Sequence, residues 1–149
     1  MKASDRLMIE RACERLVLEA SYALDLGDAE AIARCFTETC QFIRPSTYPD
    51  SPIVGRGPLI EIVRARSPHY VGRHVMSNIR VSAISTNEAR ATSFLCNFAA
   101  VSEPAVPGPC SIDDALRSLG EYEDHLTLGT CWQIRRRVGR FIFGSKFSP

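Results

Sequence analysis

The 149-residue sequence lacks the short motifs that indicate a metal centre, a nucleotide site or a serine nucleophile. It contains no HExxH pair, no Gly-rich phosphate loop and no GxSxG turn. Its six cysteines include no CxxC pair, and we interpret them as reduced thiols that mostly fill the core. The sequence therefore predicts no metal and no other cofactor.

An excess of one charge and long apolar runs are also missing. The net charge is +1, and Arg135, Arg136 and Arg137 form the only basic run. Because neighbouring residues of a strand point to opposite faces, this run does not make a phosphate-binding stripe, and we expect no nucleic-acid partner. No stretch approaches the roughly 18 apolar residues that cross a bilayer, and the charged beginning of the chain does not resemble a signal peptide. We expect a cytoplasmic protein with no membrane partner.

The first part of the chain has the apolar spacing of helices. Spacings of three to four predict a helix over residues 4–26, with Leu7 at the start of its inward face and Gly27 as its stop. Asp28 suits the cap of a second short helix, and Pro58 suits the first turn of a third over residues 58–66. A short strand is expected between the second and third helices, over residues 40–44.

From residue 74 onward the apolar spacing changes to two, which is typical of strands. The expected strands span residues 74–84, 88–101, 119–129 and 131–143. Residues 102–117 are rich in proline and indicate a long excursion between the second and third of these strands.

This order predicts a single α+β domain over residues 1–149. A curved, mostly antiparallel sheet with helices on its concave face would enclose one core. Where such a sheet and its helices do not quite meet, a cavity forms, and this is the usual place for a small-molecule site.

Asp25 stands out because the end of a helix disfavours an anion. Residues that break such local rules are enriched at functional sites, although position alone favours a solvated helix end. Tyr22 lies three residues earlier, on the same side of the expected helix.

His74 is the second candidate, at the start of an expected strand, because imidazole moves protons near neutral pH. Strict alternation places His74 with Asn78 and separates it from the apolar face of Val75 and Ile79, unless a bulge re-aims it. His69 and His125 are weaker candidates.

Four more polar or aromatic residues fall on the expected sheet and, with Tyr22, are candidates for substrate binding. Trp132, Ile134 and Arg136 share one strand face by alternation, and Arg136 could bind an anionic substrate or pair with a carboxylate. Asn97 and Tyr122 lie on the neighbouring strands.

Several segments together resemble one known family. They are YALDLGDAEAIARCF, GRGPLIEIV, RHVMSNIRV, and GEYEDHL followed by CWQIRRR. In order and spacing they resemble the SnoaL-like family of the nuclear-transport-factor-2-like superfamily. The resemblance implies a cone-shaped α+β barrel, in which a strongly bent sheet packs around three N-terminal helices and a pocket lies at the open end.

Within this family, the reactive positions look most similar to those of scytalone dehydratase and the lindane dehydrochlorinase. The resemblance implies that Asp25 and His74 form a proton-abstracting pair and that Tyr22, Asn97 and Tyr122 line the pocket. Scytalone dehydratase has a second histidine on the next long strand, where this chain has Asn97. Small subunits of ring-hydroxylating dioxygenases share the fold and a similar strand in a structural role.

These observations give a leading functional hypothesis and two alternatives. The leading one is a cofactor-independent lyase or isomerase, dehydratase- or cyclase-like, that abstracts a proton from a small, largely apolar cyclic substrate. The first alternative is a non-catalytic ligand-binding or assembly subunit, such as a dioxygenase small subunit, and the second is a hydrolase or cyclase using the same pocket. Exposed apolar residues such as Phe141 and Phe143 would suit a homo-oligomer, a dimer or trimer.

Overall fold

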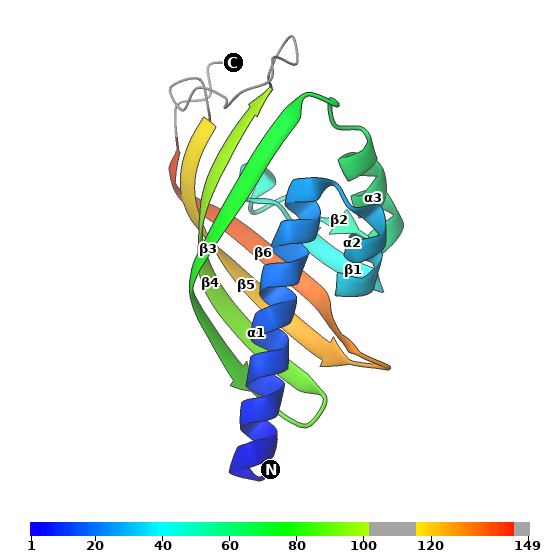
Figure 1. Ribbon diagram of the computed structural model, residues 1–149, viewed down its shortest axis with the longest axis vertical. Coiled ribbons are helices and arrows are strands. Elements are labelled where there is room, and N and C mark those ends of the chain that lie inside the picture. The colour runs from blue at the N-terminus through cyan, green and yellow to red at the C-terminus, as the bar shows by residue number, and fades with distance from the viewer. Residues whose placement is uncertain (102–115, 145–149) are drawn as a thin grey trace.

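The computed structural model describes residues 1–101 and 116–144 (Figure 1). Its helices are α1 (Ala3–Leu26), α2 (Ala29–Cys35) and α3 (Arg56–Arg64), with a short 3₁₀ turn, η1 (Pro45–Thr47). Its strands are β1 (Phe36–Ile43), β2 (Ile53–Val54), β3 (Tyr70–Ala83), β4 (Glu88–Val101), β5 (Leu116–Leu128) and β6 (Trp132–Gly144). The expected helices and the four long strands are confirmed, and the excursion falls largely on residues 102–115, outside the described residues.

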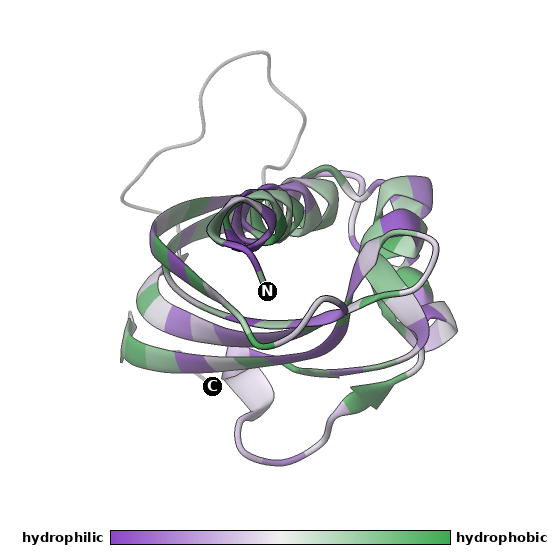
Figure 2. Cartoon of the chain, turned by 90° about the horizontal axis from the view of Figure 1, so that it is seen from below, coloured by the Kyte–Doolittle hydropathy of each residue, from purple (hydrophilic) through white to green (hydrophobic). Residues whose placement is uncertain are grey.

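The six strands form one sheet in the order β2-β1-β6-β5-β4-β3. Among the strands of the described residues, β1 and β6 run parallel and the other neighbouring pairs are antiparallel. The sheet bends around α1, which lies on its concave side, while α2 and α3 lie toward β1 (Figure 2). The α+β class and the bent sheet are therefore confirmed, and the sheet stays open because β2 and β3 do not pair with each other.

Helix α1 has a buried face in its second half, from Cys13 to Leu24. It buries Cys13, Leu16, Val17, Ala20 and Leu24, among other small or apolar residues, against the sheet. Gly27 ends the helix in a left-handed conformation, with φ 68°, which a residue without a Cβ adopts at little cost. Leu7 was wrongly expected to face inward: its exposed fraction is 68%, because the first turns of the helix project beyond the sheet (Figure 1).

A bulge in β3 decides which way His74 faces. The strand begins at Tyr70, four residues before the expected start, and its pairing with β4 shifts between Ser77 and Arg80. Asn78, with φ 50°, occupies the bulge. The extra residue changes the alternation, so His74 shares the concave face with Ile79, and Asn78 is exposed instead of lying beside His74.

A second bulge, in β6, corrects the expected placement of Arg136. Pairing with β5 shifts where Leu126 faces Ile134 and His125 faces Arg136, which leaves Arg135 unpaired. As a result Arg137, and not Arg136, follows Ile134 into the core.

None of the helices within residues 1–101 and 116–144 is long and apolar enough to cross a membrane.

Candidate functional site

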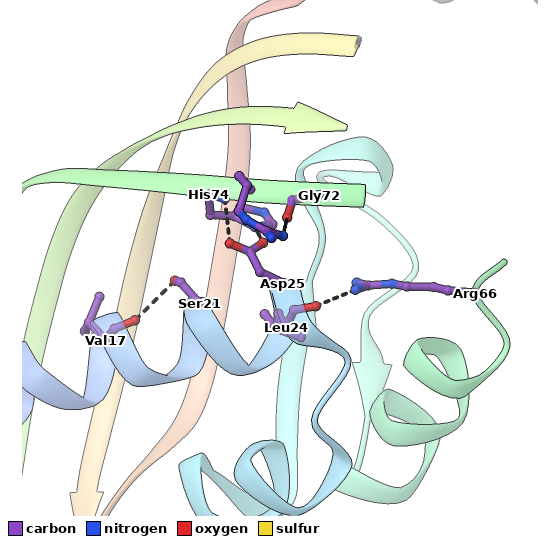
Figure 3. Close-up of polar contacts among 8 residues, drawn as sticks. Val17, Ser21, Leu24, Asp25, Arg66, Gly72 and His74 are labelled. Carbon is purple, nitrogen blue, oxygen red and sulfur yellow. Dashed lines mark hydrogen bonds and ion pairs between the residues drawn. The ribbon is translucent and has the colours of Figure 1, made fainter. Parts of the chain in front are cut away.

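The end of α1 and the first half of β3 bring Asp25 and His74 into direct contact (Figure 3). Asp25 Oδ1 lies 2.5 Å from His74 Nδ1, and Asp25 Oδ2 accepts a hydrogen bond of 2.8 Å from the backbone N–H of His74. Both side chains are largely buried, with exposed fractions of 5% for Asp25 and 14% for His74. One carboxylate thus holds both the backbone and the ring of His74.

This contact determines how His74 carries its proton when the imidazole is neutral. A carboxylate accepts hydrogen bonds, so Nδ1 carries the hydrogen and Nε2 keeps its lone pair. When Nε2 takes up a proton, the buried charge of Asp25 stabilises the imidazolium. The pair therefore has the arrangement of a histidine base that is oriented by a carboxylate.

His74 borders a cavity of about 300 Å³ between α1, α3 and the concave face of the sheet. Its apolar wall includes Leu24, Phe42, Leu59, Ile62, Val63, Leu95 and Phe141. Its polar wall consists of Arg44, Ser46, Arg66, Tyr70, His74, Asn97 and Tyr122. A mostly apolar cavity with a few polar groups is typical of a small-molecule site.

Tyr122 lies beside His74 in this cavity, with the two ring centroids 6.5 Å apart. Burial raises the pKa of Tyr122 to about 12, so its hydroxyl stays protonated at neutral pH. The guanidinium of Arg137 lies 4.5 Å from the ring centroid, and Arg137 is itself held by Asp124 through two bonds of 2.7 and 2.8 Å. This buried pair fixes the position of the Tyr122 ring.

Gly139 makes room for Tyr122. A Cβ at this position would lie 2.6 Å from Tyr122 Cε1 and 2.5 Å from Pro45 Cγ. We expect Gly139→Ala to destabilise the fold by about 1–3 kcal/mol, because the ring and the proline must both move. Gly129→Ala is the matched control, since nothing lies within 4 Å of a Cβ there. Equal urea midpoints for the two variants would contradict this role of Gly139.

Three other residues predicted for the site lie away from this cavity. Tyr22, 64% exposed, and Trp132 border a separate surface depression between α1, α2 and β6. Arg136 lines neither the cavity nor this depression, because the β6 bulge turns Arg137 inward in its place. The cavity thus joins Asn97 and Tyr122 with His74, and leaves Tyr22, Trp132 and Arg136 outside it. His125 contacts Glu123 on the other face of the sheet, at 3.3 Å.

The cavity also contains polar residues that sequence reasoning did not single out. Arg44 follows β1, Arg66 follows α3, and Tyr70 opens β3. Arg66 Nη1 donates to the carbonyl oxygen of Leu24 (Figure 3). The Arg66 guanidinium also lies 5.0 Å from the Tyr70 ring centroid. No local motif marks these residues in the sequence. Arg44 and Arg66 lie just beyond a strand and a helix, where no periodic pattern indicates which way a side chain points.

The described cysteines are poor nucleophiles where they are buried. Burial raises the pKa of Cys13 to about 12 and that of Cys35 to about 11, so both thiols stay protonated at neutral pH. Among residues 1–101 and 116–144, no group of three His, Cys, Asp or Glu side chains is placed to hold a metal ion.

Comparison with known proteins gives a family and a set of similar folds. The SnoaL-like domain family matches residues 5–138. No curated protein matches the sequence significantly. Among solved structures, a candidate scytalone dehydratase from Novosphingobium aromaticivorans is similar with a TM-score of 0.80 and 22% identity, over 99% of this chain and 93% of that chain.

Two further solved structures are similar over nearly the whole chain. The hexachlorocyclohexane dehydrochlorinase LinA-type3 from Novosphingobium barchaimii has a TM-score of 0.77 and 12% identity, over 99% of this chain and 95% of that chain. A candidate aromatic ring hydroxylase from Novosphingobium aromaticivorans has a TM-score of 0.72 and 21% identity, over 97% and 94%. At these identities the likeness shows a shared fold.

Proposed function

The chain belongs to the SnoaL-like domain family, and we propose that it is a lyase or isomerase in which His74 is the general base and Asp25 orients it. One observation carries the proposal: His74 borders a mostly apolar cavity while its Nδ1 is held 2.5 Å from a buried carboxylate. A structural histidine at the edge of a sheet does not need both features.

In the proposed reaction, Nε2 of His74 takes a proton from a carbon of a small cyclic substrate that is acidified by a carbonyl or a leaving group. In a lyase reaction, the electrons of the broken C–H bond form a double bond as the leaving group departs with its own electron pair. In an isomerisation, the imidazolium returns the proton to another atom of the substrate. Asp25 stabilises the imidazolium in both cases.

Tyr122 supports either reaction as a hydrogen-bond donor. Its phenol stays protonated because burial raises its pKa to about 12. A neutral hydroxyl beside the substrate can donate to a carbonyl oxygen or a departing group as negative charge develops there. The names of two similar folds, a dehydratase and a dehydrochlorinase, describe eliminations of this kind, and they support the proposal by analogy.

Asp25→Asn tests the pair. An amide at this position can donate to Nδ1, which would place the hydrogen of the neutral ring on Nε2 and remove the base from the cavity. We expect proton abstraction to fall by about 10²-fold or more. The assay is elimination from, or deuterium exchange into, a panel that includes scytalone and hexachlorocyclohexane, followed by NMR in D₂O.

The matched control is Asp50→Asn, an exposed carboxylate in the loop before β2. It should leave every rate unchanged. Equal activity of the two variants on a compound that the unmodified protein converts would overturn the role of Asp25.

A further inference from the structure

We propose that the cavity takes a small cyclic ligand bearing a carboxylate and that Arg44 is the anchor for this group. The inference deepens the proposed function by naming a substrate class, and it rests on that function only for which end of the ligand reacts. Arg44 directly follows β1, lies partly buried and borders the cavity.

The side chain of Arg44 is unsatisfied within the described chain. It makes no hydrogen bond and no ion pair there, and its Nε is buried without a partner. The other buried or partly buried guanidinium groups nearby are engaged: Arg137 with Asp124, Arg56 with the carbonyl oxygen of Ala33. Burying part of a charged guanidinium without a partner is costly, and a ligand anion bound by its terminal nitrogens would supply the missing counter-charge.

The charge of the cavity wall has one sign. Arg44 and Arg66 both border it, whereas no aspartate or glutamate is among the described residues that line it. Asp25 lies behind His74 and is already bound to it. Two cations that border one hollow attract an anion, and the planar guanidinium fork matches a carboxylate in particular.

Of the two cations, Arg44 is the one whose guanidinium no described residue holds in place. Arg66 already donates to the carbonyl oxygen of Leu24 and stacks on Tyr70, so its orientation is fixed by the protein. Arg66 therefore adds positive potential, while Arg44 is available for a direct, two-bonded contact.

The sheet order gives the ligand an orientation. Arg44 follows β1 and His74 lies on β3, and these strands are separated in the sheet by β6, β5 and β4. Between these two ends the wall includes the apolar residues Phe141 on β6 and Leu95 on β4, together with the polar side chains of Tyr122 and Asn97. A ligand that reaches both ends places its carboxylate near Arg44, its ring on the apolar wall and its reacting carbon near His74.

The test is a binding measurement with two probes of the same shape, 2-naphthoate and 2-naphthamide, by calorimetry or ligand-observed NMR. We expect the unmodified protein to bind the carboxylate about tenfold or more tightly than the amide. Arg44→Met should remove this preference, and Arg44→Lys should keep part of it. Arg90→Met, an exposed arginine on β4, is the control and should keep the preference in full.

Equal affinity for the two probes, no binding of either, or a preference that survives in Arg44→Met would each overturn the assignment. A preference lost equally in Arg44→Met and Arg90→Met would show only a general effect of charge, and would overturn it as well. His74→Gln should keep the preference, because its side chain is not the anchor. Loss of binding preference and loss of turnover therefore report separately on Arg44 and on the proposed reaction.

Discussion

His74→Gln is expected to reduce turnover by about 10²–10⁴-fold while leaving the fold intact. Glutamine keeps the backbone N–H that donates to Asp25 at 2.8 Å, so the contact between α1 and β3 survives. It cannot accept and hold a proton as imidazole does, so the base is lost. The loss should appear in kcat more than in KM, because the removed interaction acts in the transition state. The measurement is steady-state kinetics on whichever compound of the elimination panel the unmodified protein converts.

His125→Gln is the matched control for this variant. His125 also contacts a carboxylate, that of Glu123 at 3.3 Å, but it does not border the cavity that His74 lines. It should retain full activity. Unchanged turnover in a folded His74→Gln protein would exclude His74 as the base and would favour a ligand-binding role for the domain.

Breaking the buried pair between Asp124 and Arg137 is expected to have the largest effect on stability. The exposed fractions of the two side chains are 1% and 0%, and Nη1 of Arg137 already has no partner. Asp124→Asn leaves a buried guanidinium without its counter-charge, which typically costs about 3–5 kcal/mol. Since Arg137 also holds the Tyr122 ring, the same variant should disturb the cavity. Urea denaturation gives the change in the free energy of unfolding.

The double variant Asp124→Leu/Arg137→Met separates two contributions to the lost stability: the loss of the attraction between the two charges, and the cost of leaving one charge buried without a partner. Replacing a buried pair by apolar residues is often close to neutral, so the double variant should be more stable than Asp124→Asn. Glu14→Gln, which breaks an exposed pair with Arg11 at 2.9 Å, should change stability by less than about 1 kcal/mol. A double variant less stable than Asp124→Asn would contradict this account.

Apolar spacing was sufficient to predict the helices and the four long strands, because burial of one face determines both. It was not sufficient to predict which strand residues face the cavity. The alternation changes at Asn78 and Arg135, and such bulges depend on the packing of neighbouring strands. Asn78 did offer a signal, since asparagine tolerates a positive φ better than most residues.

The same limit explains the outcome for the individual site residues. Asp25 was noticed because it breaks a rule for helix ends, and the structure places it against His74. Tyr22 lies only three residues before Asp25 on the same helix, yet its side chain is exposed. Arg44 and Arg66 follow the ends of a strand and a helix, where no periodic pattern indicates a direction.

The hydrogen bond that Asp25 accepts from the backbone of His74 has a further consequence for the edge of the sheet. Strand β3 is an edge of the sheet, and the outward N–H groups of an edge strand can pair with a strand from another molecule. Asp25 occupies the N–H of His74, and Glu10 of the same helix accepts from that of Ala83 at 3.4 Å. Helix α1 thus occupies two of the N–H groups that an added strand would need, and the carboxylate that orients the proposed base also blocks strand pairing at this point of the edge.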